Sequence, residues 1–282
     1  MRITRSTKSI VAMCGLFAGS ALASDTSTPQ QASFFPIWGE QAKQKGYSLP
    51  KPYGFSINYL AMEQPLKIND ISLTNVAIGG LPIPDGLVQV EGGTAMQESE
   101  TLTLRADLWL FPFLNTYAIL GGTKGSSVAD VAIKLPFGQP IATKFELDFK
   151  GTTYGVGTTV VGGVGSWFAM ADVNYTKTVL DILDGEIDTI VFSPRVGYRW
   201  DGKGQVWLGA MYQNVGQNFG GNIAELGIPL INEGRFEVDQ SLEENWNGLL
   251  GGQVHISKNI DVLFELGVGK RSSVMASFGY RF

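Results

Sequence analysis

The chain contains one histidine, His255, which is the first candidate for general acid–base chemistry. A histidine base acts together with a nucleophile and an orienting acid, and these partners form a recognisable motif. No such motif surrounds His255, and a lone histidine is more often part of a structural hydrogen-bond network. The sequence therefore predicts a protein that is not an enzyme.

The sequence offers no group of residues for a cofactor or a metal ion. The segment "GVGTTVVGGVG" is rich in glycine, but it has neither the lysine nor the following helix of a phosphate loop. The one cysteine, Cys14, lies in an N-terminal segment that we expect to be removed, which leaves no thiolate ligand and no disulfide. We expect no cofactor.

Charged residues that alternate with apolar ones are the stronger candidates for a functional role. In "ETLTLRADLWL", Arg105 and Asp107 lie opposite a face of alanine and leucine. In "TIVFSPRVGYRW", Arg195 and Arg199 lie opposite a face of large apolar residues. If these segments are barrel strands, the same parity directs one polar set into the lumen: Arg105, Asp107, Asp172, Arg195, Arg199, Gln253, His255, Asp261 and Glu265.

Two interpretations of this polar lumen set differ in what the interior contains. The charges could pair and fill a narrow barrel, because burying an unpaired ion costs several kcal/mol. They could instead line a polar path that selects solutes. A small barrel is closer to the filled eight-stranded barrels than to open porins of about 16–18 strands, so the filled interior is favoured.

Ten segments show period-two alternation over the length that a membrane-crossing strand needs, about 9–11 residues. They are 53–62, 99–110, 115–124, 152–162, 165–177, 187–200, 204–213, 246–257, 259–268 and 273–282. The connections after the second, fourth, sixth and eighth segments are tight, whereas 63–98, 125–151 and 214–245 are long. This asymmetry predicts an all-β fold, an antiparallel up-and-down transmembrane β-barrel with long extracellular hairpins. Twelve strands would result if 63–98 held a further membrane hairpin.

The three long connections share a Leu/Ile-Pro element, a turn and an alternating run, as in "IKLPFGQPIATKFELDF". We predict three hairpins that continue beyond the membrane. Their apolar residues could pack together as an outer cap or form an exposed binding surface. Packing is favoured, because hairpin faces normally bury alternate residues.

Aromatic residues are expected to form two girdles where the barrel crosses the membrane interfaces. Toward the tight turns, the set is Tyr53, Phe55, Phe111, Tyr117, Trp167, Tyr198, Trp200, Trp207, Tyr280 and Phe282. Toward the long loops, the set is Tyr154, Tyr175 and Tyr212. The loop lengths and the girdles together predict that the tight turns lie in the periplasm and the long loops outside the cell.

The N-terminus indicates export. Arg2, Arg5 and Lys8 precede an apolar run, 10–23, which ends in the small residues of "ALAS". This pattern predicts a secretory signal peptide over 1–23, used by the Sec pathway. The apolar run is shorter than the roughly 20 residues that a membrane-spanning helix needs.

The predicted mature chain has two parts, a periplasmic N-terminal segment over 24–52 and the barrel over 53–282. In the first part, Ile37, Trp38 and Ala42 could line one side of a short helix under the barrel mouth, or the segment could be a spacer. Without the three basic residues of the signal peptide, 18 basic residues remain against 26 acidic ones. An acidic exported protein is not expected to bind nucleic acid.

The last ten residues, "SVMASFGYRF", place Phe278, Tyr280 and Phe282 on one face of a strand. This ending resembles the C-terminal signature of bacterial outer-membrane β-barrel proteins, although Ser277 stands where many members have glycine. The resemblance implies an outer-membrane location in a Gram-negative bacterium, among outer-membrane lipid and lipopolysaccharide. It also implies that the barrel-assembly machinery recognises Phe278, Tyr280 and Phe282. No narrower family is indicated.

Three functions follow from these observations, in decreasing order of preference. The first is a non-enzymatic barrel that stabilises the envelope or binds an extracellular ligand through its hairpins. The second is a narrow outer-membrane channel or transporter for small or apolar solutes. The third, an outer-membrane protease or lipid-modifying enzyme, is least favoured, because His255 is expected near the periplasmic end rather than in an outer cleft.

Overall fold

The computed structural model describes residues 34–78, 80–84, 86–134, 139–181, 184–200, 203–226 and 231–282. The predicted signal peptide and its cleavage site lie outside these residues. Within the described ranges, no helix is long and apolar enough to cross a membrane.

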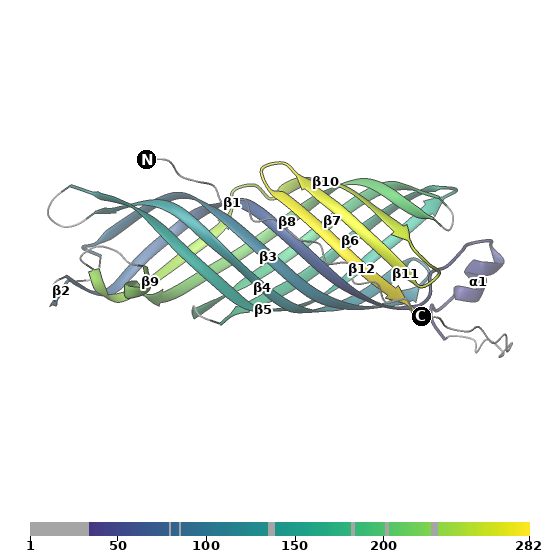
Figure 1. Cartoon of the computed structure of the whole chain (residues 1–282), viewed down its shortest axis with the longest axis horizontal. Coiled ribbons are helices and arrows are strands. Elements are labelled where there is room, and N and C mark those ends of the chain that lie inside the picture. The colour runs from purple at the N-terminus through teal and green to yellow at the C-terminus, as the bar shows by residue number, and fades with distance from the viewer. Residues whose placement is uncertain are drawn as a thin grey trace. The chain divides into compact units, whose positions relative to one another are not determined.

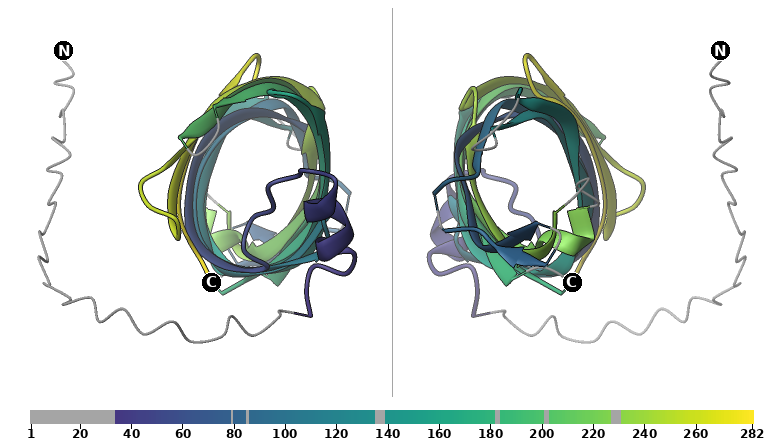
Figure 2. Two further views of the ribbon diagram at one scale, coloured as in Figure 1. Left: turned by 90° about the vertical axis from the view of Figure 1, so that its right-hand side faces the viewer. Right: turned by 90° about the vertical axis from the view of Figure 1, so that its left-hand side faces the viewer.

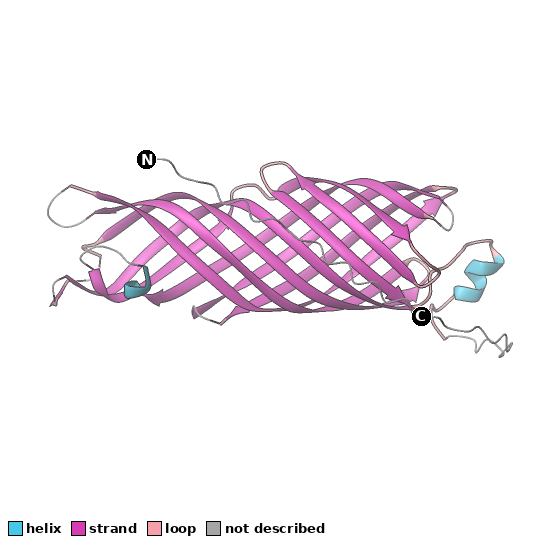
Figure 3. Ribbon diagram, in the orientation of Figure 1, coloured by secondary structure: helices cyan, strands magenta, loops and turns pink. Residues whose placement is uncertain are grey.

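One short helix, one 3₁₀ helix and a barrel of antiparallel strands make up this part of the chain (Figures 1 and 3). The elements are α1 (Gly39–Gln44), β1 (Tyr53–Ile78), β2 (Leu81–Pro82), β3 (Gln89–Phe111), β4 (Leu114–Lys134), β5 (Ile141–Val164), β6 (Trp167–Leu180), β7 (Asp184–Trp200), β8 (Gly204–Asn222), η1 (Ile223–Leu226), β9 (Ile231–Leu242), β10 (Trp246–His255), β11 (Ile260–Val268) and β12 (Ser272–Arg281). Several strands are about twice as long as a membrane crossing requires.

Ten strands close one end of the barrel into a complete ring, which Figure 2 shows along the barrel axis. The order is β1-β3-β4-β5-β6-β7-β8-β10-β11-β12, and β12 pairs with β1 to close it. We call this part the ten-stranded section. The predicted all-β fold and strand count are confirmed.

Beyond the outer ends of β11 and β12, the wall continues with fewer strands. There β9 lies between β8 and β1 and pairs with both. With β3, β4 and β5, these strands form what we call the six-stranded section, in the order β8-β9-β1-β3-β4-β5. The predicted extracellular hairpins are thus β1–β3, β4–β5 and β8–β9. The segment 63–98 extends β1 and β3 and adds only the short β2, so the twelve-stranded alternative is wrong.

The two sections have opposite polarity. In the ten-stranded section, apolar side chains such as Leu104 and Leu120 are exposed on the outside. In the six-stranded section and at the adjoining ends of β6 and β7, the apolar side chains point inward and form a core: Leu66, Ile68, Leu73, Val76, Val88, Ala95, Ala129, Val131, Ile133, Phe145, Leu147, Phe149, Leu180, Ile187, Val215, Phe219, Ile223, Phe236, Val238 and Leu242. Its outer face carries exposed charges such as Glu146 and Asp148. The prediction that the hairpins pack their apolar residues together is confirmed.

A junction between β9 and the β10–β12 strands joins the two sections. On one side the Gln213 N–H donates to the Asn245 carbonyl at 2.9 Å, and on the other the Glu243 N–H donates to the Pro65 carbonyl at 3.3 Å. Between them, the Asn247 side-chain amide donates to the Arg271 carbonyl at 2.8 Å. These hydrogen bonds hold the wall together where one strand pairing ends and the next begins.

The N-terminal segment reaches the opposite end of the barrel, beside the chain terminus (Figure 1). The Ile37 N–H donates to the Leu110 carbonyl at 2.9 Å. The Trp38 ring lies 4.9 Å from the ring of Phe111, measured between centroids. These contacts hold α1 at the mouth of the ten-stranded section.

Candidate functional site in the barrel lumen

A cavity of about 2380 Å³ occupies the ten-stranded section. It extends from α1, where Trp38 and Tyr47 line it, to Gln64, Gln97 and Gln217, where core residues such as Phe149 also line it. The apolar core of the six-stranded section lies beyond these glutamines. The interior is therefore hollow at the periplasmic end and packed at the outer end.

Lumen charges pair as expected, but the expectation that they fill the lumen is wrong, and inward-facing glycines give the physical reason. Tyr117 lies so close over Gly157 that a Cβ atom there would be 2.4 Å from the phenol ring. Trp207 lies over Gly251 in the same way, and Arg195 over Gly209. Because these glycines have no side chains, the long polar residues extend along the wall and leave the axis of the barrel free.

Arg195 and Glu265 form the most buried ion pair of the lumen. The guanidinium donates from Nε to Oε2 at 2.7 Å and from Nη2 to Oε1 at 2.9 Å, a bidentate geometry. The indole N–H of Trp207 donates to the same Oε2 at 2.6 Å. The pair links β7 to β11 across β8 and β10, so it braces four neighbouring strands of the wall.

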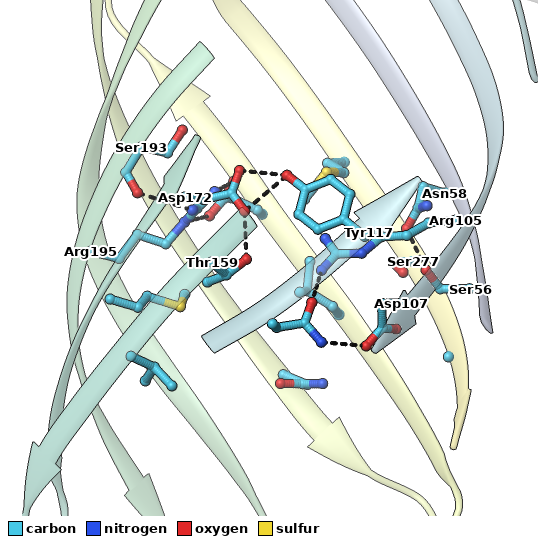
Figure 4. A pocket seen from close by; sticks show the side chains of 18 of the residues that line it. Ser56, Asn58, Arg105, Asp107, Tyr117, Thr159, Asp172, Ser193, Arg195 and Ser277 are labelled. Carbon is cyan, nitrogen blue, oxygen red and sulfur yellow. Dashed lines mark hydrogen bonds and ion pairs between the residues drawn. The ribbon is translucent and has the colours of Figure 1, made fainter. Parts of the chain in front are cut away.

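Asp172 is the centre of a second cluster, shown in Figure 4. The Tyr117 hydroxyl donates to its carboxylate at 2.8 Å, the Thr159 hydroxyl at 2.6 Å and the Asn174 amide at 3.1 Å. On the other side of Tyr117, the Arg105 guanidinium lies 3.6 Å from the ring centroid, a cation–π contact. Neutral hydroxyl and amide donors thus stabilise the Asp172 carboxylate. The Arg105 guanidinium contacts the ring of Tyr117, which lies between it and the carboxylate.

A third cluster lies nearer the mouth. Arg105 donates to the Asn115 amide oxygen at 2.9 Å, and Asn115 in turn donates to Asp107 at 2.6 Å. Arg281, from the last strand, donates to the same carboxylate at 2.7 Å. The C-terminal strand is therefore tied to β3 through the lumen as well as through its strand pairing with β1.

The upper wall of the cavity is polar but uncharged. A row of hydroxyl groups crosses β3, β4, β5 and β6, formed by Thr101, Thr123, Thr153 and Thr178 at successive distances of 2.9, 2.7 and 2.8 Å. Above it, the side-chain amides of Gln64 and Gln217 both donate to the amide oxygen of Gln97, at 2.9 and 3.1 Å. We call these three glutamines, all buried, the glutamine roof.

The structure places all nine residues of the predicted lumen set on the cavity wall. Gln205 donates to Gln253, which donates to Asp261, both at 2.7 Å. His255 is exposed near the periplasmic mouth, and Arg199 lines the same end of the cavity.

The predicted lumen set omitted two residues of the site, Tyr117 and Trp207, which were expected in the aromatic girdle toward the tight turns. Both are buried and point into the lumen, where they donate to Asp172 and Glu265. Their spacing carried the correct signal, because Tyr117 alternates in phase with Asn115 and Trp207 with Gln205.

The cavity wall carries charges of both signs. The basic residues are Lys45, Arg105, Arg195, Arg199, Lys258 and Arg281, and the carboxylates are those of Asp107, Asp172, Asp261 and Glu265. In the described residues, no group of three or more histidine, cysteine or carboxylate side chains is placed to hold a metal ion. The arrangement presents fixed charges of both signs and uncharged polar groups to a small solute.

The exterior of the ten-stranded section defines its surroundings. Exposed apolar residues cover it from Trp167 and Trp200 near one end to Tyr154 and Tyr175 near the other. Just above this belt, exposed ion pairs replace the apolar residues, as between Lys124 and Glu100 at 2.9 Å and between Lys177 and Glu186 at 2.6 Å. A closed ring satisfies its backbone groups between strands, so it can present such a belt to lipid.

These features define the class of protein. A closed barrel with an apolar belt, aromatic residues at both edges and a polar lumen is an integral outer-membrane β-barrel. Phe278 and Tyr280 are exposed on the outward face of β12, in the belt near the periplasmic edge, and Phe282, also exposed, directly follows the strand.

Comparison with known proteins gives distant likenesses only. OprG from Pseudomonas aeruginosa is 13% identical, with a TM-score of 0.42, and the match covers 83% of this chain and 99% of that chain. An outer membrane channel from Pseudomonas putida F1 is 8% identical, with a TM-score of 0.37, over 83% of this chain and 97% of that chain. The transport unit of the autotransporter AIDA-I from Escherichia coli is 9% identical, with a TM-score of 0.34, over 82% and 90%. No family model matches the chain. No curated protein matches it either.

Proposed function

We propose that the protein is an outer-membrane channel for small solutes, closed at its outer end in this conformation. The observation that carries the proposal is the cavity of about 2380 Å³ inside a membrane barrel. A barrel with a purely mechanical role gains stability by filling its interior with side chains. This chain instead keeps its long polar residues flat against the wall, over glycines.

Charges of both signs on the wall support a passage for solutes rather than a site for one ion. Two of the arginines are held in ion pairs, Arg195 with Glu265 and Arg281 with Asp107. Polar groups fixed on the wall let a solute exchange its water contacts for wall contacts without a large cost. The packed apolar core at the outer end explains why this conformation is closed.

Single-channel recording of the refolded barrel in a planar bilayer tests this proposal. We expect long closed periods with brief, discrete openings, because the outer end is packed. The double variant Arg195→Gln/Glu265→Gln should change the size of the current steps. The matched control is Lys124→Gln/Glu100→Gln, which removes an ion pair from the outside of the barrel and should leave the steps unchanged.

If no current is recorded although heat-modifiable gel mobility shows that the barrel is folded and inserted, the channel proposal is overturned. The second candidate function would then be the stronger one, a barrel that stabilises the envelope or binds a ligand through its hairpins. One observation favours it: the apolar core makes the three hairpins a rigid platform, with charges such as Lys144 and Asp239 on its outer face. Charge reversal at these two positions would then weaken ligand binding without unfolding the barrel.

A further inference from the structure

We infer that the lumen selects small anions, and that three arginines without ion-pair partners carry this selectivity: Arg199, Arg105 and Arg271. The inference rests on the proposed channel function and adds to it the chemical class of the solute. We call these residues the unpaired arginines. Arg199 lies at the periplasmic mouth, Arg105 further inside and Arg271 at the outer end of the ten-stranded section.

Positive charge exceeds negative charge on the cavity wall. Among the described residues that line the cavity, six are basic and four carry a carboxylate. The ion pairs of Arg195 with Glu265 and of Arg281 with Asp107 account for two of each. Four basic residues and two carboxylates remain, so the wall keeps a net positive charge. This excess is opposite to the composition of the chain, which has 21 basic and 26 acidic residues.

Neutral donors hold the two remaining carboxylates. Hydroxyl and amide groups donate to Asp172 in the cluster of Figure 4, and the Gln253 amide donates to Asp261 at 2.7 Å. In the part of the chain that the structure describes, no lysine or arginine forms an ion pair with either carboxylate. The remaining basic residues are therefore not neutralised by a direct contact.

Arg199 and Arg105 line the cavity with donors that the protein does not use. Within the described ranges, the guanidinium of Arg199 makes no hydrogen bond or ion pair, and its Nε is buried without a partner. The guanidinium of Arg105 donates to one acceptor, the Asn115 amide oxygen, and lies over the ring of Tyr117. A guanidinium has more N–H donors than these contacts occupy, so both side chains can bind an anion.

Arg271 extends the row of unpaired arginines to the outer end of the cavity. It directly precedes β12, and it is only 2% exposed. Its Nη2 donates to the Asn245 carbonyl at 3.3 Å, whereas its Nε and Nη1 are buried without partners. The N–H of Gln213, a residue that lines the cavity, donates to the same carbonyl at 2.9 Å. The guanidinium thus lies beside the end of the cavity, and its charge has no counter-ion among the described residues.

The chemistry of these side chains sets the class of solute. An unpaired buried ion costs several kcal/mol, and an anion bound to Arg271 offsets that cost. Arginine and lysine are the usual lining of pores that conduct anions. Guanidinium groups bind carboxylates and phosphates through paired N–H donors, so organic and inorganic anions share the chemistry that the unpaired arginines recognise.

Reversal potentials of the refolded protein in a gradient of potassium chloride test this inference. We expect chloride to be about sevenfold more permeant than potassium, because a wall potential of about one kT raises the anion and lowers the cation about 2.7-fold each. Arg105→Gln/Arg199→Gln should bring this ratio close to one. The matched control, Arg235→Gln/Lys150→Gln, removes two positive charges from the exposed exterior and should leave the ratio unchanged.

The wild-type ratio alone can overturn the inference. Equal permeability, or a preference for potassium, would overturn it and leave the channel standing. An anion preference that survives in the double variant would overturn the assignment to Arg105 and Arg199. If the double variant does not fold, as heat-modifiable mobility would show, Arg199→Gln breaks no hydrogen bond and should give an intermediate ratio. If inserted barrels carry no current, both the channel and the inference are overturned.

Acetate and phosphate, added in turn to the chloride solutions, distinguish organic from inorganic anions. An anion that binds the unpaired arginines should lower the chloride current in the wild type, and the reduction should be lost in Arg105→Gln/Arg199→Gln. A reduction by acetate alone would identify carboxylates, and a reduction by phosphate alone would identify phosphates. If neither anion lowers the current, the binding of anions by these arginines is overturned.

Arg271 has a test that does not depend on current. A ligand that binds only the folded state raises its unfolding temperature by mass action. Phosphate at severalfold its dissociation constant should raise that of the wild type by about 2–4 °C, and Arg271→Gln should lose the rise. Arg235→Gln, which removes an exposed guanidinium, is the matched control and should respond as the wild type does. Equal rises in the wild type and in Arg271→Gln would overturn the anion site at Arg271.

Discussion

The ten-stranded and six-stranded sections share continuous strands but use the same alternation in opposite ways. On β5, Val160 and Glu146 both face outward, and Thr153 and Phe145 both face inward. The outward position is apolar where lipid surrounds the barrel and charged where water does. The inward position is polar around the cavity and apolar in the packed core. Alternation therefore specifies the strand, and the surroundings decide which face is apolar.

The sections also differ in what closes them. Backbone ladders close the ten-stranded ring completely, so its interior does not have to be filled to hold the wall together. In the six-stranded section, β5 above Gly151 pairs with β4 alone among the described residues, and the apolar core packs against its inner face. The ten-stranded section can thus keep a cavity because backbone hydrogen bonds close its wall, whereas the six-stranded section depends on its packed core.

The largest effect is expected when one buried charge of the ten-stranded section loses its partner. Glu265→Leu leaves Arg195, whose side chain is only 12% exposed, without its carboxylate. Loss of one partner of a buried ion pair costs about 3–5 kcal/mol. We expect the free energy of unfolding, measured by urea titration in lipid vesicles, to fall by this amount.

The control for this change is the double variant Arg195→Met/Glu265→Leu, in which no charge remains unpaired. Replacing both members of a buried pair by apolar residues is often nearly neutral. The double variant should recover most of the lost stability. If it is as unstable as the single variant, the pair acts through its shape in the wall rather than through its charge.

A lysine on the outward face of β5 tests the boundary between lipid and water. Val160→Lys places a charge in the apolar belt, where it costs about 2–4 kcal/mol near the middle of the bilayer. Glu146→Lys, on the same face of the same strand in the six-stranded section, should change the unfolding free energy by less than about 0.5 kcal/mol. Similar costs at the two positions would contradict the change of surroundings along this strand.

Alternation was sufficient to predict the membrane part of the fold. The strands predicted at 259–268 and 273–282, for example, appear close to their predicted bounds in β11 and β12, whereas the one predicted at 99–110 is the membrane part of the longer β3. The loop lengths predicted the hairpins, because short and long connections cannot be exchanged in an up-and-down barrel. The pairing of β9 with both β8 and β1 could not be predicted, since it depends on which hairpins meet above the membrane.

Alternation predicted which residues line the lumen, but it did not predict the shape of the cavity. Parity placed Arg195 and Glu265 in the lumen, but the sequence does not say whether side chains cross the lumen or lie along its wall. That choice depends on which residues are neighbours across strands, such as Gly251 beside Trp207. Cross-strand register is a property of the closed barrel, so the cavity could be recognised only in the structure.

The smallest effect is expected in the row of hydroxyl groups on the cavity wall of the ten-stranded section. Thr153 lies in the middle of the hydroxyl row, bonded to Thr123 at 2.7 Å and to Thr178 at 2.8 Å. Thr153→Val keeps the shape and removes both hydrogen bonds, so we expect a loss of about 1–2 kcal/mol in the free energy of unfolding. The neighbouring Thr152 faces outward and is exposed, and Thr152→Val should be neutral. A neutral result at both positions would mean that water in the cavity replaces the lost bonds, and the row would then be part of a wetted wall rather than a brace.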